Sequence, residues 1–527
     1  MTGAAPDPEG RPDTGNEGAG PGTMLGALVA EAARRYGDVP AYVSPEGVAL
    51  TYGELDALSD QVAAGLEARG VGAGDVVSLL LPSGATYAVV YAAAAKIGAV
   101  TAGVNDKLSP PERRRCLEIA GPRLVVAADE LAAATAIETM AGLTTVVAVD
   151  PDLPPAATLA PLRSSGVAAT GRLRPDPERP VAVVFTSGTT GAPKGAVFCE
   201  RQLDAISEAD GGRRWGTGGR GLASTSFAHL GYMTKLFQGL RGGGTSFVMR
   251  KWSAGEALAM VARHRVTTLG GIPTQVALML AHDDFDTTDL SSVRIIAMGG
   301  GPATAALVRE ARRRFGVPVV VRYTCTEAGV GVGTVVDDPP EDAEESVGRA
   351  RAGVELTIRD DDDAVLPAGR TGQVCLRSDA VMARYHDDPA ATAAALTTDG
   401  AVRTGDLGFI DERDRLHLAG RSKEMYVRGG YNVFPLEVEE VLADHPAVAH
   451  VAVAPRPDPV MGEIGVAVVV PRTGVEAPTL DGLRSHARGR LATHKLPEAV
   501  MVTDELPRTA MEKIDRRLLA QMVAGRT

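Results

Sequence analysis

The hydrophobic pattern of the chain alternates between short apolar runs and longer stretches with one apolar face. Residues 76–81, 100–104 and 123–128 have the length and β-branched content of buried strands. Residues 85–97 and the segment that begins at Ser109-Pro110-Pro111 are predicted helices, the second with a serine cap and proline in its first turn. This alternation predicts βαβ units and a mostly parallel sheet.

The same alternation extends over most of the chain. A helix is predicted at 24–36, and Thr51 with Glu54 forms a capping box before an apolar face of Leu55, Leu58, Val62 and Leu66. Further helices are predicted at 203–209, 230–240, 254–264, 274–281 and 303–315. Further strands are predicted at 181–185, 221–226, 245–249, 293–298, 319–323, and, as an antiparallel pair, 354–359 and 372–377.

Beyond residues 420–423 the pattern changes to a compact α+β unit. It predicts a hairpin, a helix from Pro435, strands at 448–454 and 466–470, a helix near 480–491 and a final helix after Asp515. The predicted fold class is therefore α/β, with a large N-terminal domain of mostly parallel sheets flanked by helices and a small mobile α+β domain. The expected division is a disordered tail at 1–22, the large domain at 23–420 and the small domain at 421–527.

Composition narrows the functional classes. The chain has 527 residues and a formal charge of −12, which argues against non-specific nucleic-acid binding. Its four cysteines form no C-x-x-C pair, so a reducing, cytoplasmic location is expected. The N-terminal tail lacks the apolar core of a secretory signal, and charged, proline and glycine residues interrupt the most apolar region, 76–104. No membrane span is expected.

A stretch rich in glycine and hydroxyl groups, FTSGTTGAPKG, begins at Phe185 and ends at Gly195. Glycines let backbone N–H groups close around an anion, hydroxyls add donors, and Lys194 supplies a positive charge. The Walker spacing fails, because Pro193 precedes the lysine and Gly195 follows it. The stretch predicts a polyphosphate cradle of another kind, formed by Thr186, Ser187, Gly188, Thr189, Thr190 and Gly191.

A second candidate motif, Tyr323-Thr324-Cys325-Thr326-Glu327, follows a predicted strand. A carboxylate at a strand end can hold Mg²⁺ beside phosphates, because this ion prefers oxygen ligands that it shares with a nucleotide. Tyr323 can stack on a base. Two other patterns are set aside: H-x-x-x-D at 282–286 is a chance match in a charged loop, and no G-x-S-x-G elbow contains Ser187.

The glycine-rich stretch and Y-T-C-T-E resemble two motifs of the adenylate-forming superfamily, which includes acyl-CoA synthetases, luciferases and peptide-synthetase adenylation domains. The resemblance runs from Met24 to the C-terminus. Its later motifs, in family order, are Thr404-Gly405-Asp406, Gly420-Arg421-Ser422-Lys423, the segment RGGYNVFP and the segment LPRTAMEKI. The sequence of the segment RGGYNVFP is closest to that of fatty-acyl and related CoA ligases.

The resemblance implies a role for each matched residue. Asp406 and Arg421 would contact the ribose, Lys423 would be the hinge, and Lys513 would reach the carboxylate and the α-phosphate. Glu327, with Thr190, would hold Mg²⁺. The expected nucleotide-binding set also contains Gly300, Gly301, Tyr323 and Thr326. Gly429 and Gly430 would admit the pantetheine arm of coenzyme A, and His229 would separate the acyl and pantetheine sites.

The implied reaction is activation of a carboxylic acid by ATP as an acyl-adenylate, followed by attack of coenzyme A after the small domain rotates. The expected cofactors are ATP/AMP, Mg²⁺ and coenzyme A. No carrier signature follows the small domain, so free coenzyme A is the expected acceptor. The expected acyl pocket, formed by Tyr232, Met233, Leu236, Gly300 and Thr324, carries no charge, which favours an apolar acyl or aryl acid over an amino acid.

Two departures from the family pattern keep alternatives open. Thr324 stands where the family usually has glycine, and Ala401-Val402 replace two aromatic residues before the T-G-D motif. One alternative is an enzyme that only forms the thioester from a preformed acyl-adenylate. The other is an inactive nucleotide-binding regulator. The oligomeric state is left open, a homodimer included.

Overall fold

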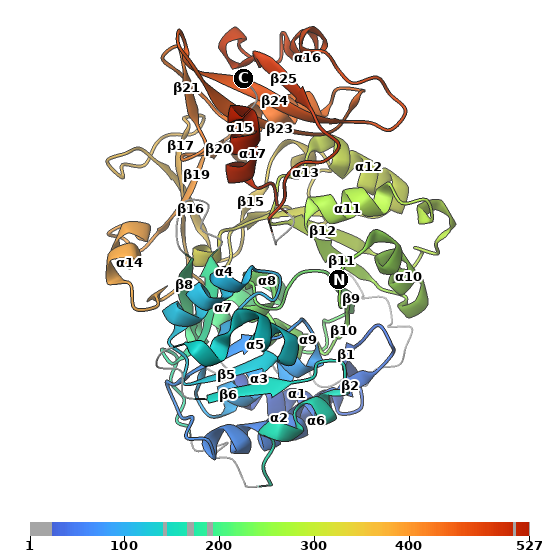
Figure 1. The fold of residues 1–527 in the computed structure, drawn as a ribbon, viewed down its shortest axis with the longest axis vertical. Helices are drawn as coiled ribbons and strands as arrows, with labels where there is room; N and C mark the ends of the chain where they lie inside the picture. Colours follow the sequence, from blue (N-terminus) through green and yellow to red (C-terminus); the bar gives the residue numbers. More distant parts are fainter. Residues whose placement is uncertain (1–23, 141–144, 166–172, 187–192, 510–512, 526–527) are drawn as a thin grey trace, which may run out of the picture.

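The computed structural model describes residues 24–140, 145–165, 173–186, 193–509 and 513–525 (Figure 1). It has a large N-terminal part, in blue to yellow, and a small C-terminal domain, in orange to red, at one end. This agrees with the predicted α/β class and with a small domain at the C-terminal end.

The first sheet of the large part is mostly parallel, as predicted. Its strand order is β18 (Arg384–Tyr385), β8 (Lys194–Cys199), β7 (Pro180–Thr186), β4 (Val100–Gly103), β3 (Val76–Leu80), β5 (Leu124–Ala128) and β6 (Thr145–Val149). Only the β7–β8 and β8–β18 pairings are antiparallel among its described pairs. Strands β3 and β5 are buried at every position, because helices cover both faces.

The helices around this sheet divide between its faces. One buried cluster joins α1 (Leu25–Tyr36), α2 (Tyr52–Glu67) and α3 (Ala85–Lys96), and a second, on the other side, includes α4 (Pro110–Ala120). The predicted capping box of Thr51 with Glu54 is confirmed, and the predicted serine cap at Ser109 is part of a second capping box, with Glu112. The remaining elements are α5 (Asp129–Thr135), η1 (Ile137–Thr139), α6 (Pro155–Thr158), η2 (Ala160–Leu162) and α7 (Glu200–Gly211).

The second sheet has a parallel centre and antiparallel edges. Its order is β15 (Arg349–Ala350), β14 (Val332–Gly333), β13 (Val319–Tyr323), β12 (Ile295–Gly299), β11 (Thr268–Gly271), β9 (Arg220–Ala223), β10 (Thr245–Val248), β1 (Pro40–Val43) and β2 (Ala49–Thr51). Its helices are α8 (Leu230–Met233), α9 (Leu236–Gly242), α10 (Ala254–His264), α11 (Pro273–Leu280), α12 (Ala305–Phe315) and α13 (Asp342–Glu345), with η3 (Phe285–Thr287) and η4 (Thr326–Ala328).

A third, antiparallel sheet leads to the small domain (Figure 1). Its order is β16 (Glu355–Arg359), β17 (Gly372–Arg377), β19 (Val402–Ile410) and β20 (Leu416–Arg421), with α14 (Pro389–Ala395) before β19. The predicted antiparallel pairing of the first two strands is confirmed. The turn after β20 carries Ser422, whose N–H donates to Gly405 O at 3.1 Å.

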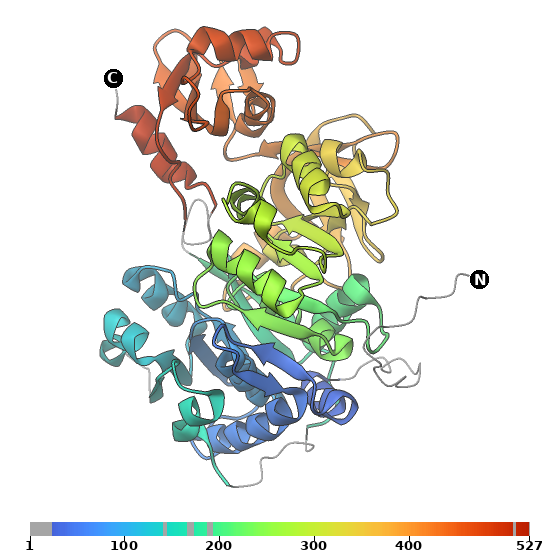
Figure 2. The same cartoon turned by 90° about the vertical axis from the view of Figure 1, so that its right-hand side faces the viewer.

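The small domain has its own sheet and cores. Its strands are β22 (Tyr431–Val433), β21 (Tyr426–Arg428), β24 (Gly462–Pro471) and β23 (Val448–Asp458), with β25 (Ala499–Val502) beside β24. One face packs against α15 (Pro435–Ala443) and α16 (Leu480–Ala487), and the other against α17 (Arg516–Ala524). A 3₁₀ turn, η5 (Thr493–Lys495), precedes β25. The described residues between β25 and α17, 503–509 and 513–515, extend toward the large part (Figures 1 and 2).

Two differences from the sequence prediction affect the site. The predicted helix 230–240 is divided into α8 and α9, which end and begin on either side of Thr234 and Lys235. The Thr234 hydroxyl and its backbone N–H both donate to Leu230 O, at 2.7 and 3.3 Å, at the end of α8. Strand β8, which was not predicted, follows the glycine-rich stretch directly. The stretch therefore connects the two strands of an antiparallel hairpin.

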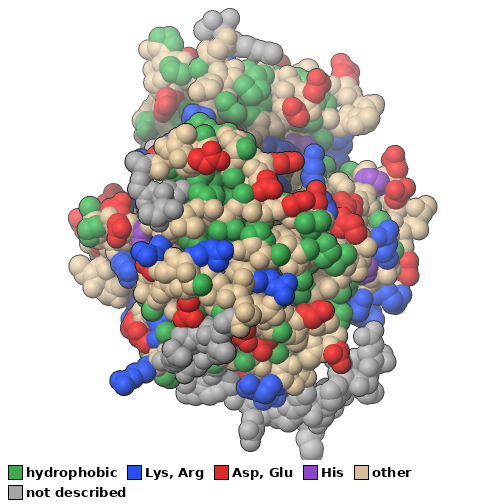
Figure 3. All heavy atoms as spheres, turned by 60° about the horizontal axis from the view of Figure 1, so that its bottom comes forward, with side chains coloured by type: hydrophobic (Ala, Val, Ile, Leu, Met, Phe, Trp, Pro, Cys, Tyr) green, Lys and Arg blue, Asp and Glu red, His purple; other side chains and the backbone are tan. Residues whose placement is uncertain are grey.

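The surface agrees with the composition. On the face seen in Figure 3, acidic and basic side chains are interspersed, without the continuous basic band that a nucleic-acid backbone needs. Within the described residues, none of the helices has the length and apolar character to cross a membrane.

Candidate active site

The glycine-rich stretch begins and ends on paired strands. Thr186 and Lys194 are register partners at the connected end of the β7–β8 hairpin, and Lys194 N donates to Thr186 Oγ1 at 3.4 Å. Lys194 is exposed, and its Nζ lies 5.0 Å from the ring centroid of Tyr385. The other predicted cradle residues, Ser187, Gly188, Thr189, Thr190 and Gly191, lie outside the described residues.

Tyr385 connects the lysine to the candidate magnesium ligand. Its hydroxyl donates to Glu327 Oε1 at 2.5 Å, and the backbone of Glu327 accepts a hydrogen bond from Met382 N at 2.8 Å. Tyr385 was not among the predicted residues, because it lies on β18, a short edge strand with no motif around it. No group of three or more His, Cys, Asp or Glu that could hold a metal occurs within the described residues. One carboxylate fits Mg²⁺, which takes its other ligands from phosphates and water.

Three predicted nucleotide residues meet at Asp406. Asp406 and Arg421 face each other across β19 and β20, with Arg421 Nε 3.1 Å from Asp406 Oδ1. The Tyr323 hydroxyl, from the end of β13, donates to the other carboxylate oxygen, Oδ2, at 2.7 Å. The carboxylate is buried, and its two oxygens receive donors from two different sheets. Burial and then the Asp406 charge raise the pKa of Tyr323, so its hydroxyl stays protonated.

Lys513 reaches the same region from the small domain. Its carbonyl accepts a hydrogen bond from Thr509 N at 2.8 Å, and Asp515 caps α17 directly after it. Burial and then the nearby charge of Arg421 lower the pKa of Lys513, while Asp406 acts in the opposite direction. Arg508 Nη1 donates to Thr274 Oγ1 of the large part at 3.3 Å. The lysine segment is thus docked against the large part near Asp406.

His229 is held in a neutral state beside these groups. Asn105 Oδ1 accepts from Lys107 N at 3.0 Å, which turns Nδ2 of the same amide toward His229 Nε2 at 2.9 Å. In this arrangement Nε2 accepts the bond and the imidazole is uncharged. Burial and then the charges of Lys513 and Lys107 lower the pKa of His229 to about 4. His229 forms the N-cap of α8.

The predicted acyl residues follow His229 on α8 and α9. Tyr232 is half-buried and stacks on Phe227 at 3.6 Å between ring centroids. Met233 has no exposed surface, and its sulfur accepts from the Tyr87 hydroxyl at 3.1 Å. Leu236 is also buried. Met233 and Leu236 therefore lie in the core behind Tyr232.

The remaining large-domain candidates lie on loops after parallel strands. Gly300 follows β12 and has a positive φ of +77°. A Cβ atom added at Gly300 would lie 3.6 Å from Ile272, and one added at Gly301 would lie 3.6 Å from Pro273, at the start of α11. Thr326 begins η4 after β13. The Thr324 hydroxyl donates to Cys325 O at 3.1 Å. Since parallel strands end at a common edge, these loops share one side of the sheet.

Gly429 and Gly430 form the turn of the β21–β22 hairpin, with φ of +56° and +85°. Gly429 N donates to Met461 O at 2.8 Å, within the small domain, and both glycines are exposed. The tight turn that two adjacent glycines permit is therefore present. Lys423 lies in the exposed turn between β20 and β21.

Comparisons with known proteins agree with this geometry. Residues 29–386 match the model of the family described as AMP-binding enzyme, and residues 437–513 match that of the AMP-binding enzyme C-terminal domain. The chain belongs to the AMP-binding enzyme family. The predicted resemblance to adenylate-forming enzymes is therefore confirmed, and this AMP-binding enzyme carries both parts of the family architecture.

Relatives resemble this AMP-binding enzyme over nearly their whole length. It is 34% identical over 496 residues to an indoleacetate–CoA ligase of Aromatoleum aromaticum, covering 91% of this chain and 94% of the relative. The amide bond synthetase McbA of Marinactinospora thermotolerans has a TM-score of 0.85 at 28% identity, covering 95% of this chain and 100% of that one. An anthranilate CoA ligase, AuaEII, in complex with anthranoyl-AMP has a TM-score of 0.86 at 25% identity, covering 95% and 97%.

Proposed function

We propose that this AMP-binding enzyme is an acid–thiol ligase that converts a carboxylic acid, ATP and coenzyme A into an acyl-CoA, AMP and pyrophosphate through an acyl-adenylate. The observation that carries the proposal is the convergence of Lys513, from the small domain, with Asp406, Arg421 and His229. The pKa of Lys513 is lowered first by burial and then by Arg421, and Lys513 in turn contributes to lowering the pKa of His229.

In the first step, the residues of the candidate active site favour attack of the substrate carboxylate on the α-phosphate of ATP. Asp406 would accept hydrogen bonds from the ribose hydroxyls. These bonds would form beside, or in place of, the bonds that the Asp406 carboxylate now accepts from Tyr323 and Arg421. Lys513 and Lys194 place positive charge beside the negative charge that develops on the transferred phosphate oxygens. Mg²⁺, held through Glu327 and Thr190, would neutralise further phosphate charge when bound.

In the second step, the thiol sulfur attacks the acyl carbonyl and AMP leaves. The C–S bond forms, the bond between the acyl carbon and the AMP phosphate oxygen breaks, and the thiol loses its proton. Lys513 then has no role, because no bond at the α-phosphorus is made or broken. A rotation of the small domain about Lys423 would withdraw Lys513 and bring Gly429 and Gly430 to the site, with the domain boundary near residue 421. The structure's arrangement of Lys513 suits the first step. His229 is neutral and half-buried beside the acyl residues, which fits a residue that separates the acyl site from the thiol site.

The acid is proposed to be apolar, because Tyr232 and its neighbours present no charged group that would bind an amino acid. We expect the protein in the cytoplasm, with a homodimer as one oligomeric state to be checked by light scattering.

The decisive experiment offers purified protein a panel of aryl, aliphatic and amino acids with ATP, Mg²⁺ and coenzyme A, and measures thioester formation. Carboxylate-dependent ATP–pyrophosphate exchange is measured in parallel. Exchange together with thioester supports the full reaction, whereas turnover of amine-bearing acids alone contradicts the apolar assignment.

Thr324 favours a second candidate function, the thioester half-reaction alone, because its side chain stands where the family has glycine. Thioester formation from a synthetic acyl-adenylate without any exchange would select this candidate. If the adenylate and coenzyme A also yield no thioester, the chain is a nucleotide-binding regulator instead.

A further inference from the structure

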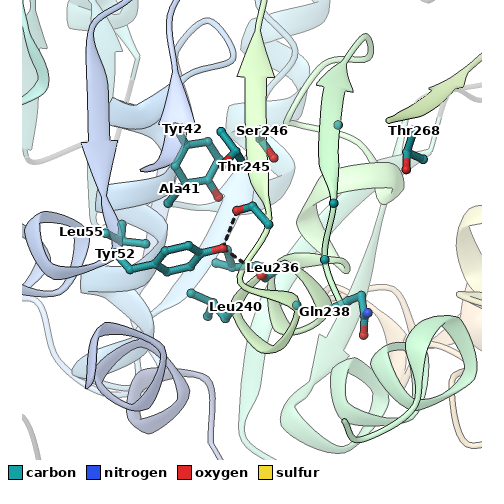
Figure 4. Close-up of a pocket in the computed structure, with 16 residues that line it drawn as sticks. Ala41, Tyr42, Tyr52, Leu55, Leu236, Gln238, Leu240, Thr245, Ser246 and Thr268 are labelled. Atoms are coloured by element: carbon teal, nitrogen blue, oxygen red, sulfur yellow. Dashed lines mark hydrogen bonds between the residues drawn. The ribbon is translucent and has the colours of Figure 1, made fainter. Parts of the chain in front are cut away.

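A pocket of about 250 Å³ is lined by Leu236, one of the candidate acyl residues (Figure 4). We call it the rear pocket. Tyr42 and Tyr52 line it from β1 and α2, and Leu236, Gln238 and Leu240 line it from α9. Much of the rest is glycine backbone: Gly218, Gly219, Gly221, Gly239, Gly242 and Gly244.

Two of the polar side chains of the rear pocket, Tyr52 and Thr245, are hydrogen-bonded to backbone. The Tyr52 hydroxyl is within 3.1 Å of Gly239 O and 2.8 Å of Gly244 O (Figure 4). Thr245 Oγ1 donates to Pro40 O at 2.8 Å. A guest would meet the leucine side chains of Leu55, Leu236 and Leu240 together with glycine backbone and the polar side chains of Gln238, Ser246 and Thr268. The volume is below that of a typical ligand pocket, so it suits the end of a chain rather than a whole ligand.

A hydrogen-bonded pair of tyrosines separates this pocket from the candidate active site. The hydroxyls of Tyr42, which lines the rear pocket, and Tyr232, which lies one turn after His229, are 2.8 Å apart. Tyr232 also stacks on Phe227, and Tyr87 meets both rings edge-on at 5.9 Å. Leu236, four residues further along the chain at the start of α9, already lines the rear pocket.

The partition is fixed by packing and by its own hydrogen bond. Tyr42 is 7% exposed, and burial raises its pKa to about 12, so its hydroxyl stays protonated. The two hydroxyls satisfy each other, which removes the penalty that either would incur if it were buried alone. A ring held on three sides by aromatic contacts cannot turn aside without losing them.

We propose that the Tyr42–Tyr232 pair is the end wall of the acyl site. It restricts the enzyme to compact aryl or short acyl acids, and the rear pocket is an extension that the pair keeps closed. This inference rests on the proposed function, because it assigns the acid that the same site accepts. Removal of the Tyr232 ring would join the two spaces and admit a longer chain.

The test compares the chain-length profile of the unaltered enzyme with that of Tyr232→Ala, from butanoate to tetradecanoate with benzoate alongside, by kcat/KM for thioester formation. The unaltered enzyme is expected to prefer benzoate and short acids. In Tyr232→Ala, kcat/KM is expected to rise about tenfold for every two methylenes that enter the rear pocket. Tyr42→Leu opens the same wall from the side of the rear pocket. It replaces Tyr232→Ala in the test if Tyr232→Ala does not fold.

A refilling variant makes the test specific to the rear pocket. Gly239 lies in α9, lines the pocket and has no atom within 4 Å of an added Cβ. Gly239 is exposed at the pocket lining, so a leucine at this position is expected to occupy part of the rear pocket, and it is also a better helix former than glycine. The double variant Tyr232→Ala/Gly239→Leu is expected to lose the gain for long acids. Tyr91→Phe, a change at another buried tyrosine, whose hydroxyl donates to Met233 O at 2.6 Å, leaves the wall in place and is expected to keep the original profile.

Two results overturn the inference: an unaltered enzyme that already prefers long acids, or an opened variant that folds, turns over benzoate and keeps the original profile. If no variant yields any thioester or adenylate, the proposed function fails instead. Calorimetric titration with decanoate then tests, independently of catalysis, whether the Tyr42–Tyr232 pair closes the acyl site. Binding to Tyr232→Ala but not to the unaltered protein supports it, and equal binding contradicts it.

Discussion

The nucleotide side and the acyl side of the candidate active site use different interactions. At Asp406, one carboxylate receives Tyr323 from the second sheet and Arg421 from the neighbouring strand, with Lys513 arriving from the small domain. At Tyr232, aromatic rings and a single pair of neutral hydroxyls fill the space. The first side depends on the placement of charge, and the second depends on volume. Single-atom changes should therefore affect the first, and only changes in size should affect the second.

The largest expected effect is that of Lys513→Ala. It removes a positioned cation from the adenylation step, so ATP–pyrophosphate exchange is expected to fall about 10²- to 10³-fold. Thioester formation from a synthetic acyl-adenylate is expected to change by less than about tenfold, because no bond to the α-phosphate forms in that step. Arg517→Ala, which removes an exposed charge from the same segment, is the control. Equal losses in both half-reactions would contradict the assignment.

A smaller loss is expected from Asp406→Asn, which keeps the shape of the side chain and removes its charge. Charged hydrogen bonds contribute about 1.5–3 kcal/mol each, so the KM for ATP is expected to rise roughly 10- to 100-fold. The variant should also discriminate less between ATP and 2′-deoxy-ATP. Asp361→Asn, in an exposed turn, should leave both measurements unchanged. An unaltered KM for ATP would remove Asp406 from the ribose site.

Tyr385→Phe tests the connection between Lys194 and Glu327. Loss of one hydrogen bond to a carboxylate is expected to reduce adenylation about tenfold. If the tyrosine positions Glu327 for Mg²⁺, the Mg²⁺ concentration at half-maximal rate should rise as well. Tyr431→Phe, an exposed tyrosine of the small domain, is the matched control. A fall in kcat with an unchanged Mg²⁺ dependence would assign Tyr385 to packing alone.

The smallest expected effect concerns pH. Burial and then the Lys513 and Lys107 charges lower the pKa of His229 from 6.5 to about 4, so the unfolded chain binds this proton more strongly than the folded one. The neutral imidazole therefore contributes stability above about pH 6.5, and that contribution is lost as the pH falls toward 4. Between about pH 7 and pH 4.5, the Tm of His229→Gln should fall by less than the Tm of the unaltered protein. An identical pH dependence of Tm in both proteins would show that His229 is not held neutral.

Sequence reasoning identified most of the long elements and the ordered motifs. The capping boxes at Thr51 and Ser109, the buried strands β3 and β5 and the boundaries of α10 and β13 agree with their local patterns. These features depend on residues within one or two turns, so a local pattern contains the information. Short strands such as β8 and β11 were missed, since a run of four to six residues is stabilised by its neighbours in the sheet.

The site was predicted only as far as its motifs extend. Asp406 and Arg421 were each predicted, but their direct pairing depends on the register of β19 with β20. Tyr385 had no sequence signal, because its contact with Glu327 joins residues 58 positions apart. The Tyr42–Tyr232 pair joins residues 190 positions apart and became visible only when α8 and β1 were packed together.

The sequence by itself determined the family, because the order and spacing of several motifs are properties of the chain. It also determined the alternation of strands and helices, because hydrophobic periodicity is local. The tertiary structure decided which side of the small domain meets the large one, so that Lys513 rather than Gly429 and Gly430 lies at the site. It also decided that aromatic rings close the acyl site. Both outcomes depend on packing between distant segments, whose free energy no local pattern specifies.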